Sequence, residues 1–435
     1  MRVNAAKCGI MVIRGQDEVI ADVESSVDEE RLKRLKVEDS HSSDPFVVMG
    51  DEIPIVDEYI YLGVRFTSDL ALHSMMTHCV SKGRRALSAM YYLLTRKDYP
   101  VFIKILAIKA KLQPIVTYGA EVWGMASSRT TEIQKIVDEA CRRVIQGGRS
   151  SAMKRIRSEL GIQTCANIGA VKRARAIVKW RRAKTWIASM ISSEFRSRRW
   201  TWVSGSLRWM QRYARIENER DRTKEKVNEL FASREEDRES LVGSWAADLG
   251  LSKNPVWILL GVRYPELQRG CFGLGRIRSG TFNFMPNLAN KRIVVRRFYS
   301  FCPFCESKVS ETAIHLFFTC PRWDEYRDHY FSWWSTGASQ YIKNINLNSS
   351  MVWQSLIRVL LGEEIGSNVL SSLGLRDGNS VGKEQFGIDT FVLPAVRYLQ
   401  KIIPLREAMI QRIIVGDQKF SWSQSPMDMA ELVAP

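Results

Sequence analysis

The residues with the clearest chemistry lie in the segment 302-CPFCESKVSETAIHLFFTC-320. Structural Zn²⁺ sites use thiolates and imidazoles, four of them arranged as a tetrahedron. The spacing C-x2-C-x9-H-x4-C supplies four such groups in order. Because four protein ligands leave no position for water, the pattern predicts a structural zinc ion rather than a catalytic one. The predicted ligands are Cys302, Cys305, His315 and Cys320.

The residues between these ligands suit a compact metal site. Pro303 stiffens the turn between the first two cysteines. The run 312-TAIHLFFTC-320 predicts a short helix, capped by Ser310 or Thr312, that returns the histidine and the last cysteine to that turn. Since metal binding and folding are coupled in such sites, we expect the loss of a ligand to unfold residues 299–325 locally. The alternative is that the cysteines are core thiols and the histidine lies on an aromatic helix face.

The net charge points to a polyanionic partner. The 435 residues carry a formal net charge of +17. Such a surplus usually indicates nucleic acid as the partner, and less often an anionic membrane surface. No apolar run approaches the roughly 18 residues of a membrane span, and the N-terminus lacks a signal-peptide pattern. The eight cysteines are few for the length, so we expect a nuclear or cytoplasmic protein that does not bind membranes.

Most of this charge lies in residues 172–215, which hold 13 Lys or Arg, one acid (Glu194) and five tryptophans. Arg and Lys neutralise phosphates and release counterions, which gives salt-sensitive affinity without sequence preference. The tryptophans either stack on bases or hold the helices together. The alternative for the charges is a solvated helix face. Nucleic-acid contacts are predicted for Lys172, Arg173, Arg175, Lys179, Arg181, Arg182, Lys184, Arg196, Arg198 and Arg199.

The predicted fold class is α+β and mainly α-helical, with a small N-terminal β element. β-Branched and aromatic runs predict strands before residue 67, and helical spacing follows. Pro114 is expected to interrupt a helix, Gly161 to close one over 151–160, and Ser204–Gly205 to break another. The expected segments are a β segment (1–66) with an acidic loop (14–44), a helical domain (67–165), basic then mixed-charge helices (166–241), a linker (242–298), a zinc knuckle (299–325) and an unassigned helical tail (326–435).

Several short motifs occur in a fixed order along most of residues 1–325. They are Asn4, Lys7 and 8-CGIMVI-13; Tyr61, Leu62, Gly63 and Val64; 114-PIVTYGAEVWG-124; Glu159 to Ile162; 275-GRIRSGTF-282; and Cys302 to Pro321. Together they resemble the C-terminal half of reverse transcriptases from non-LTR (LINE-type) retrotransposons. The resemblance implies, in chain order, the end of a catalytic palm, a primer-grip hairpin at residues 61–64, a helical thumb and a Cys-Cys-His-Cys zinc knuckle.

The chain departs from that family at the catalytic site. The family's palm carries a Tyr-x-Asp-Asp box, and no Asp-Asp pair occurs in this sequence. Such polymerases hold two Mg²⁺ ions on palm carboxylates, so magnesium is expected only if the missing palm is supplied. We therefore predict no catalytic residues in this chain. The resemblance makes the missing palm and fingers a candidate partner, beside RNA, RNA–DNA hybrid or DNA.

Three functions remain open from the sequence. The first is a nucleic-acid-binding fragment of a retrotransposon reverse transcriptase that has no polymerase activity alone. The second is an active RNA-directed DNA polymerase whose reading frame was assigned too short, in which case the natural chain begins upstream of Met1. The third is a zinc-stapled protein-interaction module whose basic stretch binds acidic partners. Binding to nucleic acid separates the first from the third, and the upstream reading frame tests the second.

Overall fold

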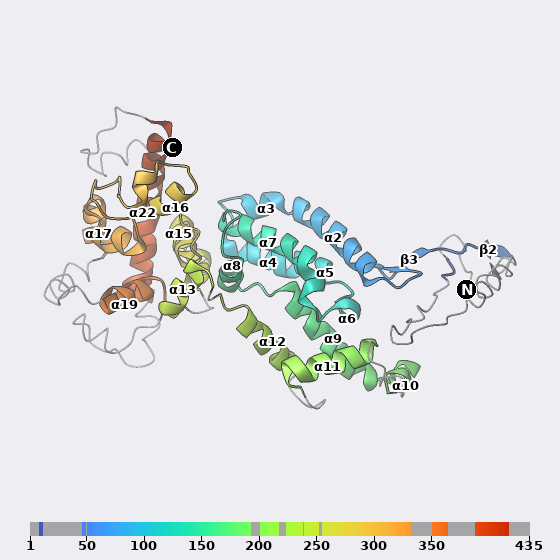
Figure 1. The fold of residues 1–435 in the computed structure, drawn as a ribbon. Coiled ribbons are helices and arrows are strands. Elements are labelled where there is room, and N and C mark those ends of the chain that lie inside the picture. The colour runs from blue at the N-terminus through green and yellow to red at the C-terminus, as the bar shows by residue number, and fades with distance from the viewer. Residues whose placement is uncertain are drawn as a thin grey trace, which may run out of the picture.

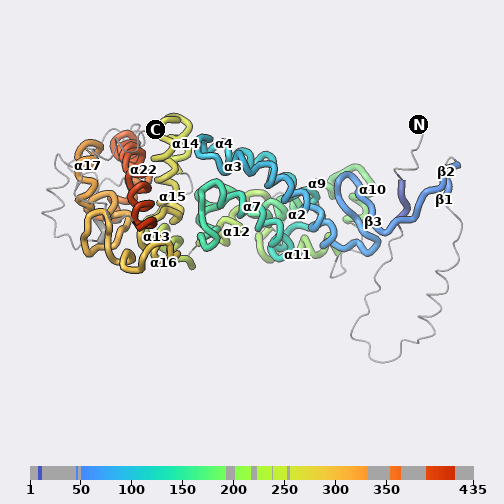
Figure 2. Tube along the Cα trace, turned by 90° about the horizontal axis from the view of Figure 1, so that it is seen from above, coloured from blue at the N-terminus to red at the C-terminus, as the bar shows by residue number. Residues whose placement is uncertain are grey.

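The structure, a computed structural model, describes residues 8–11, 46–48, 50–192, 201–216, 223–237, 239–251, 255–331, 350–363 and 388–416. These residues are mainly helical, with two small β-hairpins near the N-terminus, as the predicted fold class requires. Figure 1 and Figure 2 show an elongated molecule, with the hairpins at one end and the long helix α22 (Leu393–Val415) at the other. Within the described ranges, no helix is both long enough and apolar enough to cross a membrane.

The N-terminal element consists of two antiparallel hairpins. The first pairs β1 (Phe46–Val48) with β2 (Asp51–Ile53), and the second pairs β3 (Glu58–Tyr61) with β4 (Val64–Thr67). The second turn is Leu62–Gly63, and both residues have positive φ, 47° and 81°. Two consecutive positive φ values match a type I′ turn, whose twist suits a two-residue hairpin. The expected acidic loop (14–44), Asn4 and Lys7 lie outside the described residues.

Residues 72–160 form a central helical unit. Its core contains Leu94, Val116 and Trp123, which are fully buried. Gly161 has a φ of +59° and closes the last helix, as the sequence predicts. The helices are α2 (Leu72–Ala89), α3 (Tyr91–Thr95), α4 (Val101–Ala107), η2 (Ile108–Leu112), α5 (Gln113–Val116), α6 (Ala120–Trp123), η3 (Ser127–Thr130), α7 (Thr131–Ile145) and α8 (Met153–Leu160).

Three π-helical turns in the described ranges each end two residues before a proline. A proline has no N–H, and its ring collides with the carbonyl four residues earlier in a regular α-helix. A π turn is wider and changes the position of that carbonyl. The expected break at Pro114 is therefore wrong, because helical residues continue from Val101 to Val116. The turns are η2 before Pro114, η7 (His315–Thr319) before Pro321 and η11 (Ile388–Val392) before Pro394.

Four further helices, called here the basic helices, pack around a second, smaller core. This core includes Ala170, Ile177 and Val227. The break expected at Ser204–Gly205 is wrong, because both residues lie in the first turn of α11, where Thr201 forms a capping box. The basic helices are α9 (Cys165–Arg181), α10 (Trp186–Ser192), α11 (Trp202–Ala214) and α12 (Thr223–Arg234).

The described residues of 241–416 form a C-terminal lobe around α22 (Figure 1). Tyr398, Leu399 and Ile402 of α22 are fully buried. A Cβ at Gly270 would lie 2.1 Å from the Val396 carbonyl oxygen, so a glycine is needed where α15 meets α22. The expected linker (242–298) and the unassigned tail thus pack against each other. The other elements are α13 (Leu241–Asp248), α14 (Val256–Arg263), η5 (Pro265–Leu267), α15 (Gln268–Arg278), α16 (Met285–Asn290), η6 (Arg296–Tyr299), η8 (Pro321–Trp323), α17 (Asp324–Tyr330) and α19 (Ser350–Leu360).

Candidate metal centre and basic surfaces

The four predicted zinc ligands lie together in the C-terminal lobe. Their ligand atoms are all within 4.8 Å of one another. Cys305 Sγ lies 3.4 Å from His315 Nε2. A tetrahedral ion with Zn–S of about 2.3 Å and Zn–N of about 2.0 Å would hold its ligand atoms about 3.5–3.8 Å apart. Three of the four side chains are buried and Cys305 is partly exposed, so the group fits a closed structural zinc site.

A tight turn presents the first two cysteines. The Cys302 amide donates to the Ser307 carbonyl at 3.2 Å, and the Ser307 hydroxyl lies 2.9 Å from Cys305 Sγ. Glu306 closes the turn with a φ of +57°, in the left-handed region. This conformation turns the chain back within five residues. The loop therefore places both thiols on the same side, as a C-x2-C metal turn requires.

The π turn η7 presents the other two ligands. The Cys320 amide donates to the His315 carbonyl at 2.8 Å, a bond that spans five residues and brings these two ligands together. Thr312 is the capping residue, because its hydroxyl accepts from the His315 amide at 3.2 Å, whereas Ser310 bonds to the Tyr299 carbonyl. The expected short helix is therefore mostly a π turn.

Hydrogen bonds within the group prepare it for a cation. His315 Nδ1 lies 3.0 Å from the Thr319 hydroxyl. If Nδ1 donates there, the lone pair of Nε2 faces the cysteines, and such outer bonds orient metal-binding histidines. The hydrogen bond from Cys320, with a smaller effect of His315, lowers the pKa of Cys302 and raises that of Cys320. One thiolate is thus favoured in the metal-free group.

The knuckle is attached to α22 by buried polar contacts. Arg406 Nε and Nη2 each donate to a different Glu311 oxygen, both at 2.6 Å. The Tyr398 hydroxyl donates to the Leu316 carbonyl at 2.7 Å. The Arg406 guanidinium also lies 5.2 Å from the ring centroid of Phe304, which lies between the first two cysteines. Because α22 matches none of the motifs, the sequence alone did not reveal this attachment.

The predicted nucleic-acid contacts in the basic helices have different environments. Arg173 is buried and Lys172 is half-buried, with its Nζ donating to the Thr117 carbonyl at 2.7 Å. Arg181 is also half-buried. Arg196, Arg198 and Arg199 lie outside the described residues. The exposed members of the set are Arg175, Lys179, Arg182 and Lys184.

Arg173 holds three elements together. Its guanidinium donates to the carbonyls of Val122 and Gly124 at 3.1 Å and to the Ser206 hydroxyl at 2.8 Å. It also lies 5.3 Å from the ring centroid of Trp202. Burial lowers its pKa to about 10. Arg173 thus joins α9 to the end of α6 and to α11, which is a structural role.

Three of the tryptophans also have internal partners. Trp180 and Trp202 stack with centroids 5.2 Å apart, and the Trp202 indole donates to the Glu121 carbonyl at 3.1 Å. Trp209 packs on Phe231. Trp186, by contrast, is 71% exposed. These contacts favour the interpretation that Trp180, Trp202 and Trp209 hold helices together.

Replacing Arg173 with methionine is expected to lower the free energy of unfolding by about 3 kcal/mol, because several buried carbonyls lose their donor. Arg175→Met, on the exposed face of the same helix, is the matched control and should change stability by less than about 0.5 kcal/mol. Urea denaturation measures both. Equal stability of the two variants would contradict the structural role of Arg173.

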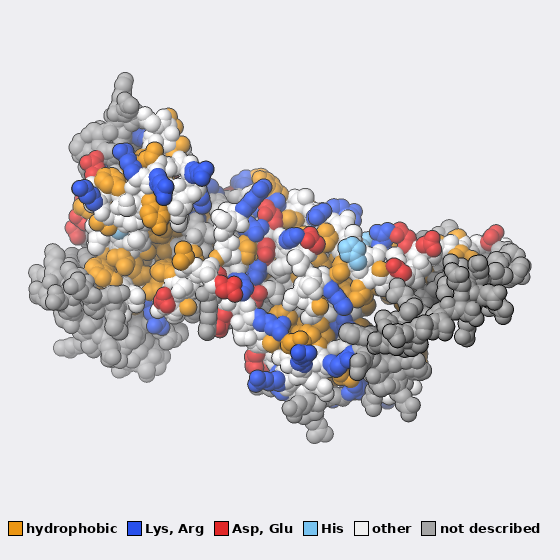
Figure 3. Space-filling view, in the orientation of Figure 1, with side chains coloured by type: hydrophobic (Ala, Val, Ile, Leu, Met, Phe, Trp, Pro, Cys, Tyr) orange, Lys and Arg blue, Asp and Glu red, His pale blue; other side chains and the backbone are white. Residues whose placement is uncertain are grey.

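A second basic surface lies beside the knuckle. A groove of about 1010 Å³ separates residues 289–298 from the end of α22. Figure 3 shows Lys and Arg side chains gathered over the part of the lobe that contains α16 and the end of α22. No Asp or Glu is among the groove's lining residues, all of which are described. The arginines that line it are Arg292, Arg296, Arg297 and Arg412.

Two pairs of the sequence motifs contact each other in the structure. The Tyr118 hydroxyl, in the segment 114–124, donates to the carbonyl of Leu62 at 2.7 Å, so this segment contacts the turn of the Tyr61–Val64 hairpin. Tyr61 and Leu62 themselves are exposed. Farther along, Glu159 of the Glu159–Ile162 motif is fully buried against Arg278 of the segment 275–282.

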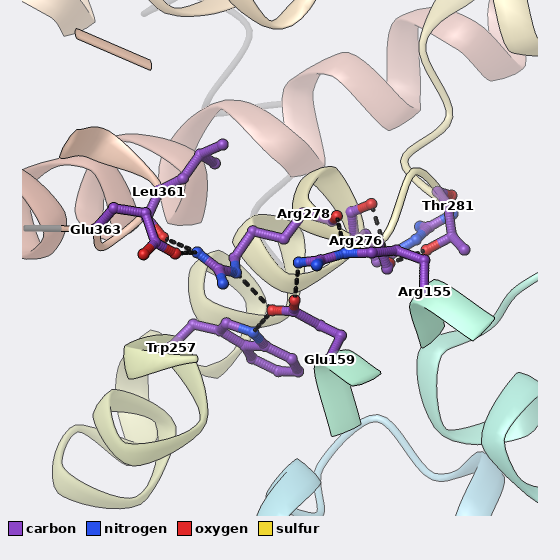
Figure 4. Close-up of polar contacts among 9 residues, drawn as sticks. Arg155, Glu159, Trp257, Arg276, Arg278, Thr281, Leu361 and Glu363 are labelled. Carbon is purple, nitrogen blue, oxygen red and sulfur yellow. Dashed lines mark hydrogen bonds and ion pairs between the residues drawn. The ribbon is translucent and has the colours of Figure 1, made fainter. Parts of the chain in front are cut away.

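Glu159 is the centre of a buried network that joins the central helical unit to the C-terminal lobe (Figure 4). Its Oε1 accepts from Arg278 Nε at 2.5 Å and from the Trp257 indole at 2.8 Å, while Arg155 pairs with its other oxygen. Arg278 continues the network to Glu363 at 2.9 Å. Sequence reasoning identified both motifs but assigned no role to Glu159 or Arg278.

Comparison with known proteins adds no assignment: the chain matches no protein-family model, and no curated protein is significantly similar to it. The resemblance to reverse transcriptases therefore rests on the motifs, their order and the metal-ligand pattern.

Proposed function

We propose that this chain binds RNA or RNA–DNA hybrid as the thumb and zinc-knuckle part of a retrotransposon reverse transcriptase, without polymerase activity of its own. The observation that carries the proposal is the groove beside the knuckle. Four arginines and no acid line it, and a guanidinium binds phosphate oxygens well. Nucleic-acid affinity is dominated by such backbone contacts.

The backbone of Arg292 supports a functional role for this groove. Its φ is +58°, in the left-handed region that follows a helix end and that glycine occupies without strain. The Arg292 side chain is exposed, so packing does not require an arginine here. Strained non-glycine residues occur preferentially at functional sites. An exposed arginine at this strained position supports binding of an anion.

Alternating side chains organise the same segment. Val294 and Phe298 are buried against the lobe, while Ile293, Val295 and Tyr299 are exposed beside the arginines. Aromatic and apolar groups among cations favour a nucleic-acid strand, because bases stack on or pack against them. A folded acidic protein would use the charges but has no comparable need for the exposed ring of Tyr299.

The zinc ion would have a structural role in this function. The Cys302, Cys305, His315 and Cys320 group lies next in sequence to the groove segment, and its Ser310 bonds to the Tyr299 carbonyl at 2.8 Å. With Zn²⁺ bound, three thiolates and one neutral imidazole would give the site a net charge of −1. The metal would fix the position of the groove, and the arginines would bind the phosphates.

The decisive experiment is a binding titration at several salt concentrations. A 20-nucleotide RNA, the matching RNA–DNA hybrid and DNA are titrated by fluorescence anisotropy. The variant Arg292→Gln/Arg296→Gln/Arg297→Gln is expected to lose affinity uniformly across sequences and to lower the salt slope by roughly 2–3, at about 0.7–0.9 per phosphate contact. Lys401→Gln, exposed on α22 outside the groove, is the control.

The single variant Arg292→Gly separates function from folding. Glycine removes the strain of a left-handed arginine, so the melting temperature should stay the same or rise, while affinity for RNA falls. Absence of nucleic-acid binding by the wild type at any salt concentration would instead favour the protein-interaction module. Primer extension by the purified chain with Mg²⁺ would refute the lack of polymerase activity.

A further inference from the structure

A cavity of about 650 Å³ lies between the central helical unit and the C-terminal lobe. The connection from α3 to α4 lines one side, and α14, α15 and α22 line the other. It shares no lining residue with the arginine groove. Cavities of about 300–1,000 Å³ at junctions between structural units are the usual place and size for small-molecule sites.

Three buried or largely buried cations line this cavity, and one of them, Arg406, pairs with Glu311, which leaves Lys104 and Arg276. Lys104 is 3% exposed, and its ammonium donates to the Arg96 carbonyl. Arg276 donates from Nη2 to the Thr281 carbonyl at 2.8 Å, while its buried Nε has no hydrogen-bond partner among the described residues. Among these residues, neither side chain forms an ion pair with a carboxylate.

The carboxylates that line the cavity do not neutralise these two cations. Asp98, Glu266 and Glu407 are all exposed to solvent, and Asp98 pairs with Arg96. Asp98 and Glu407 act on Lys104 and Arg276 only through longer-range attraction. Burial is the largest effect on both cations, lowering the pKa of Lys104 and lowering that of Arg276 to about 10. A buried charge without a counterion is costly, and an anion between these elements would offset that cost.

The rest of the lining suits a flat organic group. Tyr99, Phe272 and Phe282 contribute rings, and the Arg276 guanidinium lies 5.9 Å from the centroid of Phe272. We propose that this cavity binds a phosphate monoester of mononucleotide size, its phosphate held by Lys104 and Arg276 and its base against these rings. A guanidinium and an ammonium together supply the donors that phosphate oxygens accept.

Such a phosphate could come from a free nucleotide or from the phosphorylated end of a nucleic-acid strand. Thermal shift and calorimetry at constant ionic strength test the shared chemistry, with inorganic phosphate and AMP as probes. Both should raise the melting temperature of the wild type by about 2–4 °C, since a ligand that binds only the folded state stabilises it. A 5′-phosphorylated trinucleotide that competes with AMP, where the 5′-hydroxyl form does not, would identify a strand end as the source.

The variants Lys104→Met and Arg276→Met test the two cations through the melting temperature, measured without and with ligand. Without ligand, Lys104→Met should melt at the same temperature as the wild type or higher, because a desolvated charge is removed. In both variants the response to phosphate and AMP should disappear. Lys401→Met, exposed on α22 and outside the cavity, should respond as the wild type does.

An equal phosphate response in Lys104→Met and wild type would overturn the proposal, as would no response of the wild type to 10 mM phosphate. The test is independent of the arginine groove, because Lys104→Met should still bind the 20-nucleotide RNA. Loss of RNA binding in the groove variant with a retained AMP response would support two separate sites. If Lys104→Met loses both RNA binding and the response to AMP while its melting temperature is unchanged, RNA and AMP share one site. That result would refute a separate cavity site.

Discussion

Cys302→Ser is expected to abolish zinc binding at the predicted site and to unfold most of the C-terminal lobe. From the sequence, the loss of a ligand was expected to unfold only residues 299–325. In the structure, Phe317 beside the ligand His315 packs on Tyr398 of α22, with ring centroids 5.9 Å apart. Loss of the metal site would therefore also remove packing that holds α22 in place. Structural zinc contributes about 10–16 kcal/mol in isolated zinc-finger peptides, so the lobe should lose several kcal/mol.

Metal analysis and hydrogen exchange check this expectation. The wild type should contain one zinc per chain and the variant none, and amides of η7 and α22 should lose protection while those of α2 and α7 keep it. Cys271→Ala is the matched control, because Cys271 is equally buried in the lobe but lies outside the ligand group. Equal zinc in Cys302→Ser and wild type would refute the ligand assignment. Unchanged protection of α22 would refute the coupling.

Glu159→Gln is expected to destabilise the protein by about 3–5 kcal/mol. Glu159 is fully buried and neutralises Arg278 and Arg155, whose side chains are 1% and 8% exposed. Removing one partner of a buried ion pair leaves an uncompensated charge, which costs far more than the pair itself contributes. Because the network joins the central helical unit to the lobe, the variant should also loosen their contact.

Urea denaturation measures the loss, and Glu139→Gln is the control. Glu139 forms a partly exposed ion pair with Arg143 at 3.0 Å in the same unit, and ion pairs near the surface contribute about 0.2–1 kcal/mol. The double variant Glu159→Gln/Arg278→Met should lose less than the sum of its single variants, because the unpaired guanidinium is removed. Additive losses would show that Glu159 and Arg278 are not coupled.

The features that could be predicted from the sequence are those with a local cause. The ligand types and spacing of residues 302–320 predicted a group that the structure brings within 4.8 Å. Gly161 ends α8 in the left-handed conformation, which glycine adopts without strain because it has no Cβ. The YIYLGVRF run predicted strands because β-branched and aromatic residues alternate around a turn.

Other features depend on partners far away in the sequence. The motif residue Glu159 and the motif residue Arg278 are 119 positions apart, and nothing in either segment specifies the other. Arg173 belongs to a run of cations, and only the positions of α6 and α11 show that it is buried. The predicted break at Pro114 was wrong because the rule that proline interrupts an α-helix does not apply after a π turn.

The central position of α22 has a consequence for how the protein is synthesised. Helices α15 and α17 emerge from the ribosome more than 60 residues before α22, yet both pack against it. Until then, the side of α15 that contains Gly270 and Gly273, which meet Val396 and Ile403 of α22, lacks its cover. Nascent chains with such surfaces are prone to aggregate and to require chaperones. A chain that stops within residues 332–387 should therefore be insoluble, even though it contains all four predicted metal ligands.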